Sequence, residues 1–323
     1  MADSLLYLSR ADVEAVDLPM TEIIEAVEGA FREKALGRTE MPPKPGIHPS
    51  RDGFIHAMPA YLSGTGGAGL KWVSAFPENR GRDLPQITGL IVLNDATTGL
   101  PLAVMDCTWI TATRTAAASA VAARHLARPD ATSVGIVACG VQGRTHLEAL
   151  ACLFGIERVH AYDHRRSNTE RYKAEMEARL GLPITIVERA EDAVRDLDLV
   201  VTSGPIRKEP EPVIEADWLA PGAFASAVDF DSYWTGPAMA QMDVIATDDR
   251  AQMEYFRGLG YFKSTPAPHT ELAELVSDAH PGRTDARQRT LAINLGLAIE
   301  DIVTAQRVVG RARERGIGVE LPL

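Results

Sequence analysis

The stretch SVGIVACGVQGRTHLEAL, residues 133–150, passes from an apolar strand pattern through a glycine turn into a helical pattern. This order then continues, because RVHAYD at 158–163 predicts a strand and residues 167–180 predict a helix. Strands that alternate with helices predict an α/β fold, with a doubly wound parallel sheet covered by helices on both faces. Further apolar strand patterns that extend the alternation lie within 184–188, 198–204, 223–230 and 242–249.

The turn from Ala138 to Gly143 has the pattern AxGxxG, a weaker form of the dinucleotide-binding GxGxxG fingerprint. Glycines let the chain turn tightly and let a pyrophosphate approach the N–H groups at the start of the helix. Asp163 closes the second strand, where a carboxylate can accept the adenosine ribose hydroxyls. These features predict a Rossmann-type site for NAD(H), with NADP(H) less favoured. The alternative is an ordinary strand–helix turn followed by an aspartate.

The first part of the chain has a different pattern. Residues 5–36 predict a short strand and an amphipathic helix, and the alanine-rich residues 111–126 predict another helix. Between them, extended segments around 54–58, 69–76 and 89–94 are separated by turn residues and predict a mixed antiparallel sheet. We therefore expect an α+β domain before the parallel sheet, with the C-terminal helix crossing back to it.

Composition and charge exclude several classes of function. With 323 residues, of which 46% are hydrophobic, the chain can form two globular domains. Its net charge of -11 opposes binding to nucleic acid or to an anionic membrane surface. The three cysteines lack metal-ligand or disulfide-framework spacing, and no apolar run is long enough to span a membrane. We expect a cytoplasmic protein without a metal site.

Several charged residues are candidates for chemistry, and each has an ordinary structural alternative. Lys71 lies in an apolar strand pattern and could simply point to solvent. Arg114 begins the alanine-rich helix, where it could be a surface cation or could bind a carboxylate or phosphate. Asp229 and Asp231 follow an apolar strand, at the end where doubly wound sheets bind ligands, but either could also cap a turn.

A second group of cations lies earlier in the chain. Lys44, His48, Arg51 and His56 are close in sequence and could form a cationic cluster on the first domain. Such clusters are often solvated surface.

Taken in order, these motifs resemble those of the ornithine cyclodeaminase/µ-crystallin family, over nearly the whole chain. The resemblance implies a substrate-binding and dimerisation domain, residues 1–118 with 299–323, around an NAD-binding Rossmann domain, residues 119–298. It also implies a homodimer. The segments that carry it include GLKWVSAFPEN (69–79), TATRTAA (111–117), GIVACGVQGRTHLEAL (135–150) and NLGLAIEDIVTAQRVV (294–309).

The same resemblance implies roles for individual residues. Lys71 corresponds to a lysine that binds the substrate carboxylate, Arg114 to an arginine near that carboxylate and the cofactor phosphate, and Asp231 to the catalytic carboxylate. Lys44 lies close to another carboxylate-binding position. The positions that match the NAD-binding residues are Gly140, Val141, Gln142, Gly143, Asp163, Ser203, Gly204 and Asn294, the last beside the nicotinamide.

Three residues depart from the family pattern. Ala138 replaces the first glycine of the fingerprint, and Asp229 replaces a common glycine. His56 stands where cyclodeaminases that process diamines have a glutamate. Because histidine cannot hold a distal ammonium as a carboxylate does, cyclisation of ornithine or lysine is disfavoured.

The predicted reaction is the NADH-dependent reduction of a small anionic α-imino acid to the L-amino acid, or its reverse. Lys71 and Arg114 would fix the α-carboxylate, and Asp231 would pair with the iminium nitrogen and relay protons. Arg51 and His56, beside Lys44, suggest a second anionic group, so iminosuccinate is the specific prediction. The alternatives are an ornithine- or lysine-type cyclodeaminase and a non-catalytic, crystallin-like protein that binds the nicotinamide cofactor.

Overall fold

The computed structural model describes residues 4–50, 53–82 and 84–323. The chain divides into two compact units, which are described separately below. Unit 1 comprises Met1–Arg114 and Leu297–Leu323, and unit 2 comprises Thr115–Gly296. The changes between domains are expected from the sequence after residue 118 and before residue 299. The first crossing lies inside helix α3 (Thr108–Leu126).

Unit 2 contains an eight-stranded sheet in the order β10-β9-β8-β11-β12-β15-β13-β14, and every pairing in it is parallel. The predicted α/β class is therefore confirmed. All five residues of β8 are buried, as expected of a strand in a parallel sheet with helices on both faces. The strands are β8 (Ser133–Val137), β9 (Arg158–Tyr162), β10 (Ile184–Ile186), β11 (Leu199–Thr202), β12 (Phe224–Ala227), β13 (Val244–Thr247), β14 (Thr270–Glu271) and β15 (Thr290–Ile293). The helices are α4 (Val141–Ala151), α5 (Arg166–Leu180), the 3-10 helix η2 (Ala190–Ala193), α6 (Gly236–Met239), α7 (Arg250–Gly258) and α8 (Leu272–Val276).

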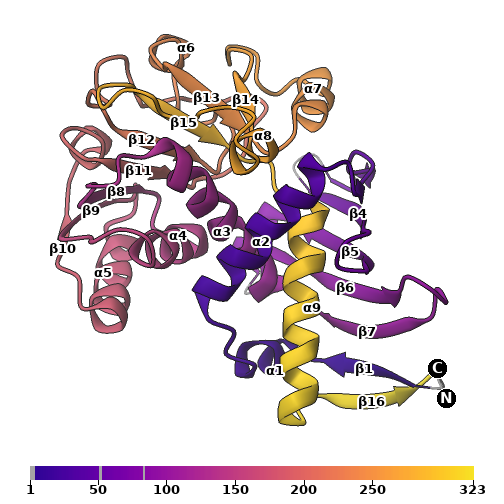
Figure 1. Cartoon of the computed structure of the whole chain (residues 1–323). Coiled ribbons are helices and arrows are strands. Elements are labelled where there is room, and N and C mark those ends of the chain that lie inside the picture. Colours follow the sequence, from indigo (N-terminus) through magenta and orange to yellow (C-terminus); the bar gives the residue numbers. More distant parts are fainter. Residues whose placement is uncertain (1–3, 51–52, 83) are drawn as a thin grey trace. The chain divides into compact units, whose positions relative to one another are not determined.

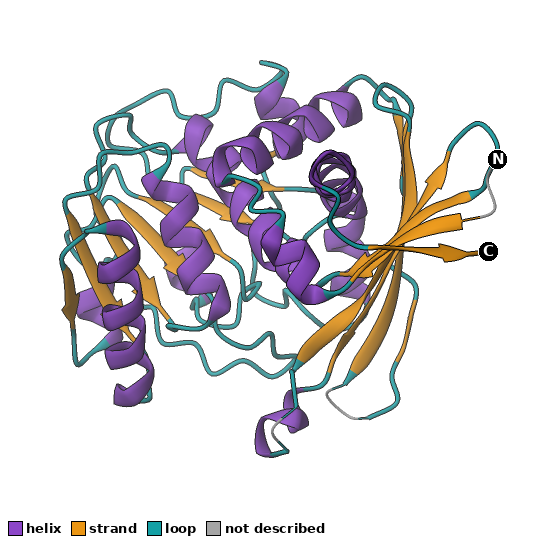
Figure 2. Cartoon of the chain, turned by 90° about the horizontal axis from the view of Figure 1, so that it is seen from below, coloured by secondary structure: helices purple, strands orange, loops and turns teal. Residues whose placement is uncertain are grey.

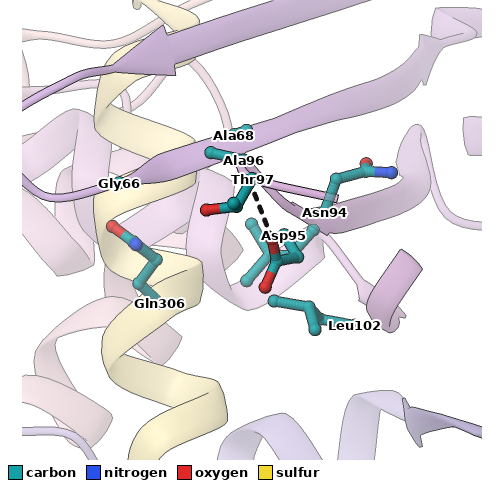
Figure 3. A pocket seen from close by; sticks show the side chains of 9 residues that line it. Gly66, Ala68, Asn94, Asp95, Ala96, Thr97, Leu102 and Gln306 are labelled. Carbon is teal, nitrogen blue, oxygen red and sulfur yellow. Dashed lines mark hydrogen bonds between the residues drawn. The ribbon is translucent and has the colours of Figure 1, made fainter. Parts of the chain in front are cut away.

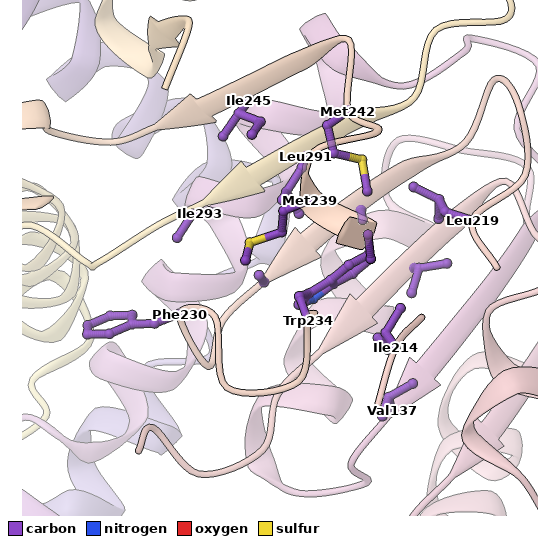
Figure 4. Close-up of a cluster of buried hydrophobic side chains, with 14 of the residues drawn as sticks. Val137, Ile214, Leu219, Phe230, Trp234, Met239, Met242, Ile245, Leu291 and Ile293 are labelled. Atoms are coloured by element: carbon purple, nitrogen blue, oxygen red, sulfur yellow. The ribbon is translucent and has the colours of Figure 1, made fainter. Parts of the chain in front are cut away.

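A hydrophobic core beside this sheet anchors the segment that follows β12 (Figure 4). Phe230 is 5% exposed and Trp234 is 2% exposed, and both pack among side chains from several strands. Burial of an aromatic side chain of this size stabilises the fold by about 1.5–3 kcal/mol. The core therefore fixes the short turn that carries Asp229 and Asp231. Its labelled members are Val137, Ile214, Leu219, Phe230, Trp234, Met239, Met242, Ile245, Leu291 and Ile293.

Unit 1 contains a second sheet, in the order β16-β1-β7-β6-β5-β4-β2, with β3 paired to β4. The pairings are antiparallel except that of β1 with β7, so the predicted mixed sheet is present. The strands are β1 (Ser4–Leu8), β2 (Thr39–Glu40), β3 (Gly46–Ile47), β4 (Phe54–Leu62), β5 (Gly67–Ala75), β6 (Ile87–Asp95), β7 (Pro101–Asp106) and β16 (Val319–Pro322). The helices are α1 (Arg10–Ala15), α2 (Met20–Ala35), the 3-10 helix η1 (Pro77–Gly81) and α9 (Ala298–Arg315).

Helices α2 and α9 contact each other, and α9 packs on β4, β5 and β6 (Figures 1 and 2). Side chains alternate between the two faces of these strands. Lys71 pairs in register with Met58 and Ile91, and all three are buried on the face that α9 covers. Trp72 and Leu90, on the opposite face, are 44% and 45% exposed. Lys71 is therefore an interior residue, and its solvent-facing alternative is excluded.

None of the described helices has the length and apolar content required to cross a bilayer.

Candidate functional site

Four buried charged groups form a connected cluster in unit 1. Lys71 Nζ lies 2.6 Å from Asp301 Oδ2, and Arg114 Nε donates to Asp301 Oδ1 at 2.8 Å. Arg114 Nη1 donates to Glu300 Oε2 at 2.7 Å. Asp301 thus uses its two oxygens to hold two cations, on β5 and α3, against helix α9.

Electrostatics in this cluster follow from its burial. The low-dielectric surroundings and the charge of Arg114 lower the pKa of Lys71, while Asp301 opposes the shift. For Arg114, burial also lowers the pKa, but the charges of Asp301 and Glu300 outweigh it and the pKa is raised. Arg114 is therefore a permanent cation, and the protonation of Lys71 depends on Asp301.

From the sequence, no function is assigned to Glu300 and Asp301, although they lie in a segment that resembles the family. Their position could have identified them, because they are consecutive acids at 300–301 among the apolar or small residues of 298–305. Residues 298–305 are all buried. Buried carboxylates require cationic or hydrogen-bonding partners, so the pair predicts buried cations opposite α9.

The second group of cations predicted from the sequence comes together in part. Lys44 is buried, and its charge, together with the charges of His48 and Lys71, acts on His56. The His56 ring stacks on Phe54 with centroids 4.0 Å apart. Burial, followed by these charges, lowers the pKa of His56 to about 4, so His56 is neutral at pH 7. Arg51 lies outside the described residues.

The predicted glycine turn in unit 2 joins β8 to α4. Gly140 is the N-cap of α4, and a Cβ there would meet nothing within 4 Å, which leaves open space for a ligand. At Gly143 a Cβ would lie 2.7 Å from the Ala138 carbonyl oxygen, so only glycine fits. Ala138 has φ 78, the left-handed conformation that favours glycine. The turn therefore has the expected geometry despite its alanine.

Replacing Ala138 with glycine is expected to stabilise the protein by up to about 1 kcal/mol, because the left-handed conformation costs a non-glycine residue about 1–2 kcal/mol and glycine's extra chain entropy offsets part of the gain. Urea unfolding measures the change. Ala174→Gly, at an exposed position inside α5, is the matched control and should destabilise by about 1 kcal/mol. Equal losses in both variants would contradict the prediction.

Asp163 is held beside this turn. Its Oδ2 accepts from the Cys139 N–H at 3.0 Å, and its Oδ1 accepts from the Arg165 N–H and the Asn168 amide, both at 3.0 Å. Since each carboxylate oxygen has about two acceptor positions, Oδ2 is the oxygen that can still accept a ribose hydroxyl. Arg166 is paired with Glu170 and Glu188, which compete with a 2′-phosphate for its guanidinium.

Asn294 follows β15 and is 4% exposed. No described residue forms a hydrogen bond with either its amide nitrogen or its amide oxygen. Buried polar groups are nearly always satisfied, so an amide without partners points to a missing polar ligand. A carboxamide, which both donates and accepts, has the matching chemistry, and the residues present therefore fit a nicotinamide group.

Asp231 and Asp229 both lie on the turn after β12. Asp231 is 5% exposed, and its Oδ2 accepts from the Thr265 hydroxyl at 3.0 Å. With Lys208, Tyr261 and other residues of unit 2, it lines a cavity of about 140 Å³. Asp229 is fully buried, and burial raises its pKa to about 7. Of the two acids, Asp231 is the one beside a cavity.

A second cavity, of about 190 Å³, lies in unit 1 near the turn between β6 and β7 (Figure 3). Its lining includes Gly66, Leu102 and Gln306. Asp95 accepts the N–H groups of Thr97 and Thr98 at 2.8 Å, so its carboxylate stabilises the turn. None of the predicted site residues lines this cavity.

Comparison with protein families identifies the family of this chain. The model of the "Ornithine cyclodeaminase/mu-crystallin family" matches residues 5–316. The chain belongs to this family. It is similar to an alanine dehydrogenase from Archaeoglobus fulgidus, with 36% identity over 98% of both chains.

Solved structures of the ornithine cyclodeaminase/mu-crystallin family share the fold of this chain. A Δ1-pyrroline-2-carboxylate reductase from Thermococcus litoralis, in complex with NADH and L-proline, has a TM-score of 0.90 and 35% identity, and the match covers 98% of this chain and all of the other. An archaeal alanine dehydrogenase dimer with bound NAD has a TM-score of 0.89 and 32% identity, with 99% of both chains covered.

Proposed function

We propose that this member of the family is an NAD(H)-dependent oxidoreductase that reduces a small α-imino acid to the L-amino acid and catalyses the reverse oxidation. The observation that carries the proposal is the buried Lys71 and Arg114, which are held in place by Asp301. The glycine turn and the unsatisfied Asn294 amide supply a matching cofactor site. The reductase bound to NADH and L-proline and the dehydrogenase bound to NAD support the same chemistry.

NAD(H) is assigned to residues of unit 2. The N–H groups from Gly140 to Gly143, at the start of α4, bind the pyrophosphate, and Asp163 accepts the ribose hydroxyls. Ser203 and Gly204 line the cofactor, and Asn294 binds the carboxamide. The bound cofactor supplies or accepts the hydride, while the protein supplies placement and charge.

The substrate carboxylate is assigned to Lys71 and Arg114, with Lys44 contributing. Arg114 directs Nε and Nη1 to the acids of α9, and the second terminal nitrogen of the guanidinium, Nη2, is the donor that we assign to the substrate carboxylate. Lys71 has three donors, of which Asp301 takes one. Asp231 pairs with the iminium nitrogen, stabilises its charge and holds the proton that the product amine gains.

We propose a substrate with a single carboxylate, such as a pyruvate-derived imine or Δ1-pyrroline-2-carboxylate. Glu300 and Asp301 already balance the charges of Lys71 and Arg114, so a second carboxylate would need further cations. His56 is not one of them at pH 7. The prediction of iminosuccinate now depends on Lys44 and Arg51, and it is the second candidate.

We also propose a homodimer through the open face of the unit 1 sheet. This face carries exposed apolar side chains, among them Tyr61 (39%), Trp72 (44%) and Leu90 (45%). Large apolar side chains exposed on one face of a sheet favour a protein–protein interface there. The similar archaeal alanine dehydrogenase is a dimer.

A substrate panel tests the function. NADH absorbance is followed with ammonia and pyruvate, glyoxylate or oxaloacetate, and with Δ1-pyrroline-2-carboxylate. We expect higher kcat/KM for the monocarboxylates, and a preference for oxaloacetate would restore iminosuccinate. Ammonia release from ornithine without net change in NADH would indicate a cyclodeaminase, and NADH binding without turnover of any substrate would indicate a non-catalytic protein. Light scattering on the same sample tests the dimer.

A further inference from the structure

Asp229 is a fully buried acid of unit 2 that contacts two loops, residues 203–204 and the turn after β12. Its Oδ1 accepts from the Thr202 hydroxyl at 3.1 Å, and its Oδ2 accepts from the Gly204 N–H at 3.1 Å. Thr202 Oγ1 in turn accepts from the Trp234 indole N–H at 3.0 Å. No cation is among the groups that act most strongly on Asp229. Only hydrogen bonds therefore compensate the burial of this carboxylate, which is an expensive arrangement.

The first of these loops, residues 203–204, is connected to the glycine turn. Ser203 donates its hydroxyl to the Ala138 carbonyl at 2.9 Å, and its N–H donates to the Val137 carbonyl at 3.0 Å. A Cβ on Gly204 would lie 2.2 Å from the Tyr233 ring, so this loop fits closely against the segment after β12. Displacement of Gly204 would therefore disturb the predicted cofactor-binding turn.

The second loop is the turn that carries Asp231. The Asp229 carbonyl accepts from the Ser232 N–H at 3.1 Å, and Phe230 between the two acids has φ 62. A bulky residue in this left-handed conformation persists only where its surroundings hold it. Asp229 therefore fixes one end of the strained turn through its backbone and holds Gly204 through its side chain.

We infer that Asp229 is a positioning residue, whose ionised side chain locks the Ser203–Gly204 loop against the Asp231 turn and so keeps the cofactor-binding surface of unit 2 in its productive arrangement. This inference rests on the proposed function, because it assigns NAD(H) to that surface. The residue itself touches neither cofactor nor substrate in this role. In a chain with glycine at this position, the lock would be absent.

Protonation provides the signature of this role. Burial raises the pKa of Asp229 to about 7, the bonds from Gly204 and Thr202 oppose the shift, and the charge of Asp231 adds to it. The titratable groups that face Asp229 are Asp231 and Tyr233. Below pH 7 the neutral acid loses its charge-assisted bonds to Gly204 and Thr202, which are about twice as strong as neutral ones. The lock is therefore expected to weaken as the pH falls from 8 to 6.

The test compares pH profiles of NAD⁺ affinity in the full chain, which does not require turnover. The wild type is expected to lose affinity by about three- to tenfold between pH 8 and 6, since the difference between a charged and a neutral hydrogen bond is of this order. Asp229→Asn should bind NAD⁺ at every pH with the weaker affinity that the wild type has at pH 6, because an amide mimics the neutral acid. Thr202→Val removes a hydrogen bond that stabilises the Asp229 carboxylate, so the midpoint of the change in NAD⁺ affinity should move to higher pH. Thr202→Ser keeps the hydroxyl and should keep the wild-type midpoint.

Tryptophan fluorescence of the free protein gives a second readout, because Trp234 donates to Thr202 and senses the same titration. A fluorescence midpoint near pH 7 that is lost in Trp234→Phe and shifted upward in Thr202→Val supports the inference, even where Asp229→Asn fails to fold. An unchanged NAD⁺ profile in Asp229→Asn, or an unshifted midpoint in Thr202→Val, overturns it. Failure of the wild type to bind NAD⁺ at any pH overturns the proposed function and the inference together, whereas pH-independent binding overturns the inference alone.

Discussion

Asp231→Asn is expected to lower kcat by about 10²- to 10⁴-fold, the range that a positioned acid–base group contributes. The amide keeps the shape and can still accept from Thr265, which now bonds to Asp231 Oδ2. It cannot carry the negative charge that stabilises an iminium nitrogen, nor can it pass a proton to the amine. The loss should therefore fall on kcat, while the affinity for NADH stays close to that of the wild type.

Stopped-flow single-turnover rates and NADH fluorescence titration separate the two effects. Asp192→Asn, an exposed aspartate of unit 2, is the matched control and should behave as the wild type. Equal turnover by Asp231→Asn and the control would remove Asp231 from the mechanism. An equal loss of NADH affinity and kcat would instead assign Asp231 to cofactor binding.

The alternation of strand and helix patterns was sufficient to predict the parallel sheet, because its central strands β8, β11, β12, β13 and β15 are buried along their whole length. Burial on both faces leaves no ambiguity of orientation in β8, where every residue is buried. The glycine turn was also predictable from local sequence, since Gly143 lies where a Cβ would meet the Ala138 carbonyl oxygen and Gly140 leaves open space at the start of α4. Ala138 shows the limit of this reasoning, because the fold imposes φ 78 on a residue that does not favour it.

The face of the sheet to which the Lys71 side chain points could not be predicted from its own strand. An alternating strand has two faces, and which of them is covered depends on α9, more than two hundred residues later in the chain. The same separation hid the ion pairs with Glu300 and Asp301. The sequence places His56 in a cationic cluster, but it does not show the burial that is the largest cause of the lowered pKa of His56, about 4.

Asp229 illustrates a further limit. The sequence marked it as a departure from a family glycine, but its hydrogen bonds to Thr202 and Gly204 depend on the parallel pairing of β11 with β12. That pairing brings the ends of the two strands together and creates the buried carboxylate. A motif comparison therefore located the residue, whereas only the fold supplied its environment.

The largest expected effect on stability is that of Asp301→Asn, a loss of about 3–5 kcal/mol at pH 7. Its carboxylate is fully buried and neutralises Lys71 while sharing Arg114 with Glu300. Without it Lys71 becomes a buried cation with no anionic partner among the described residues, whereas Arg114 keeps Glu300. Glu300→Gln is the matched control, and its smaller loss is expected because Asp301 still holds both cations.

The pH dependence of this loss identifies its cause. Burial already lowers the pKa of Lys71, and removal of Asp301 removes a group that raises it. The window lies between the lowered pKa of Lys71 in the folded chain and the pKa of about 10.4 of a lysine in the unfolded chain. Within it the unfolded chain binds more protons than the folded chain, so the free energy of unfolding must rise with pH. Urea unfolding at pH 7 and pH 9.5 should therefore show the deficit of Asp301→Asn shrinking as Lys71 becomes neutral.

The double variant Lys71→Met with Asp301→Asn should recover part of the loss at pH 7, because it removes the unpaired charge. A deficit that is constant with pH and persists in the double variant would mean that Asp301 stabilises unit 1 by packing, and that it does not hold Lys71 in its charged form.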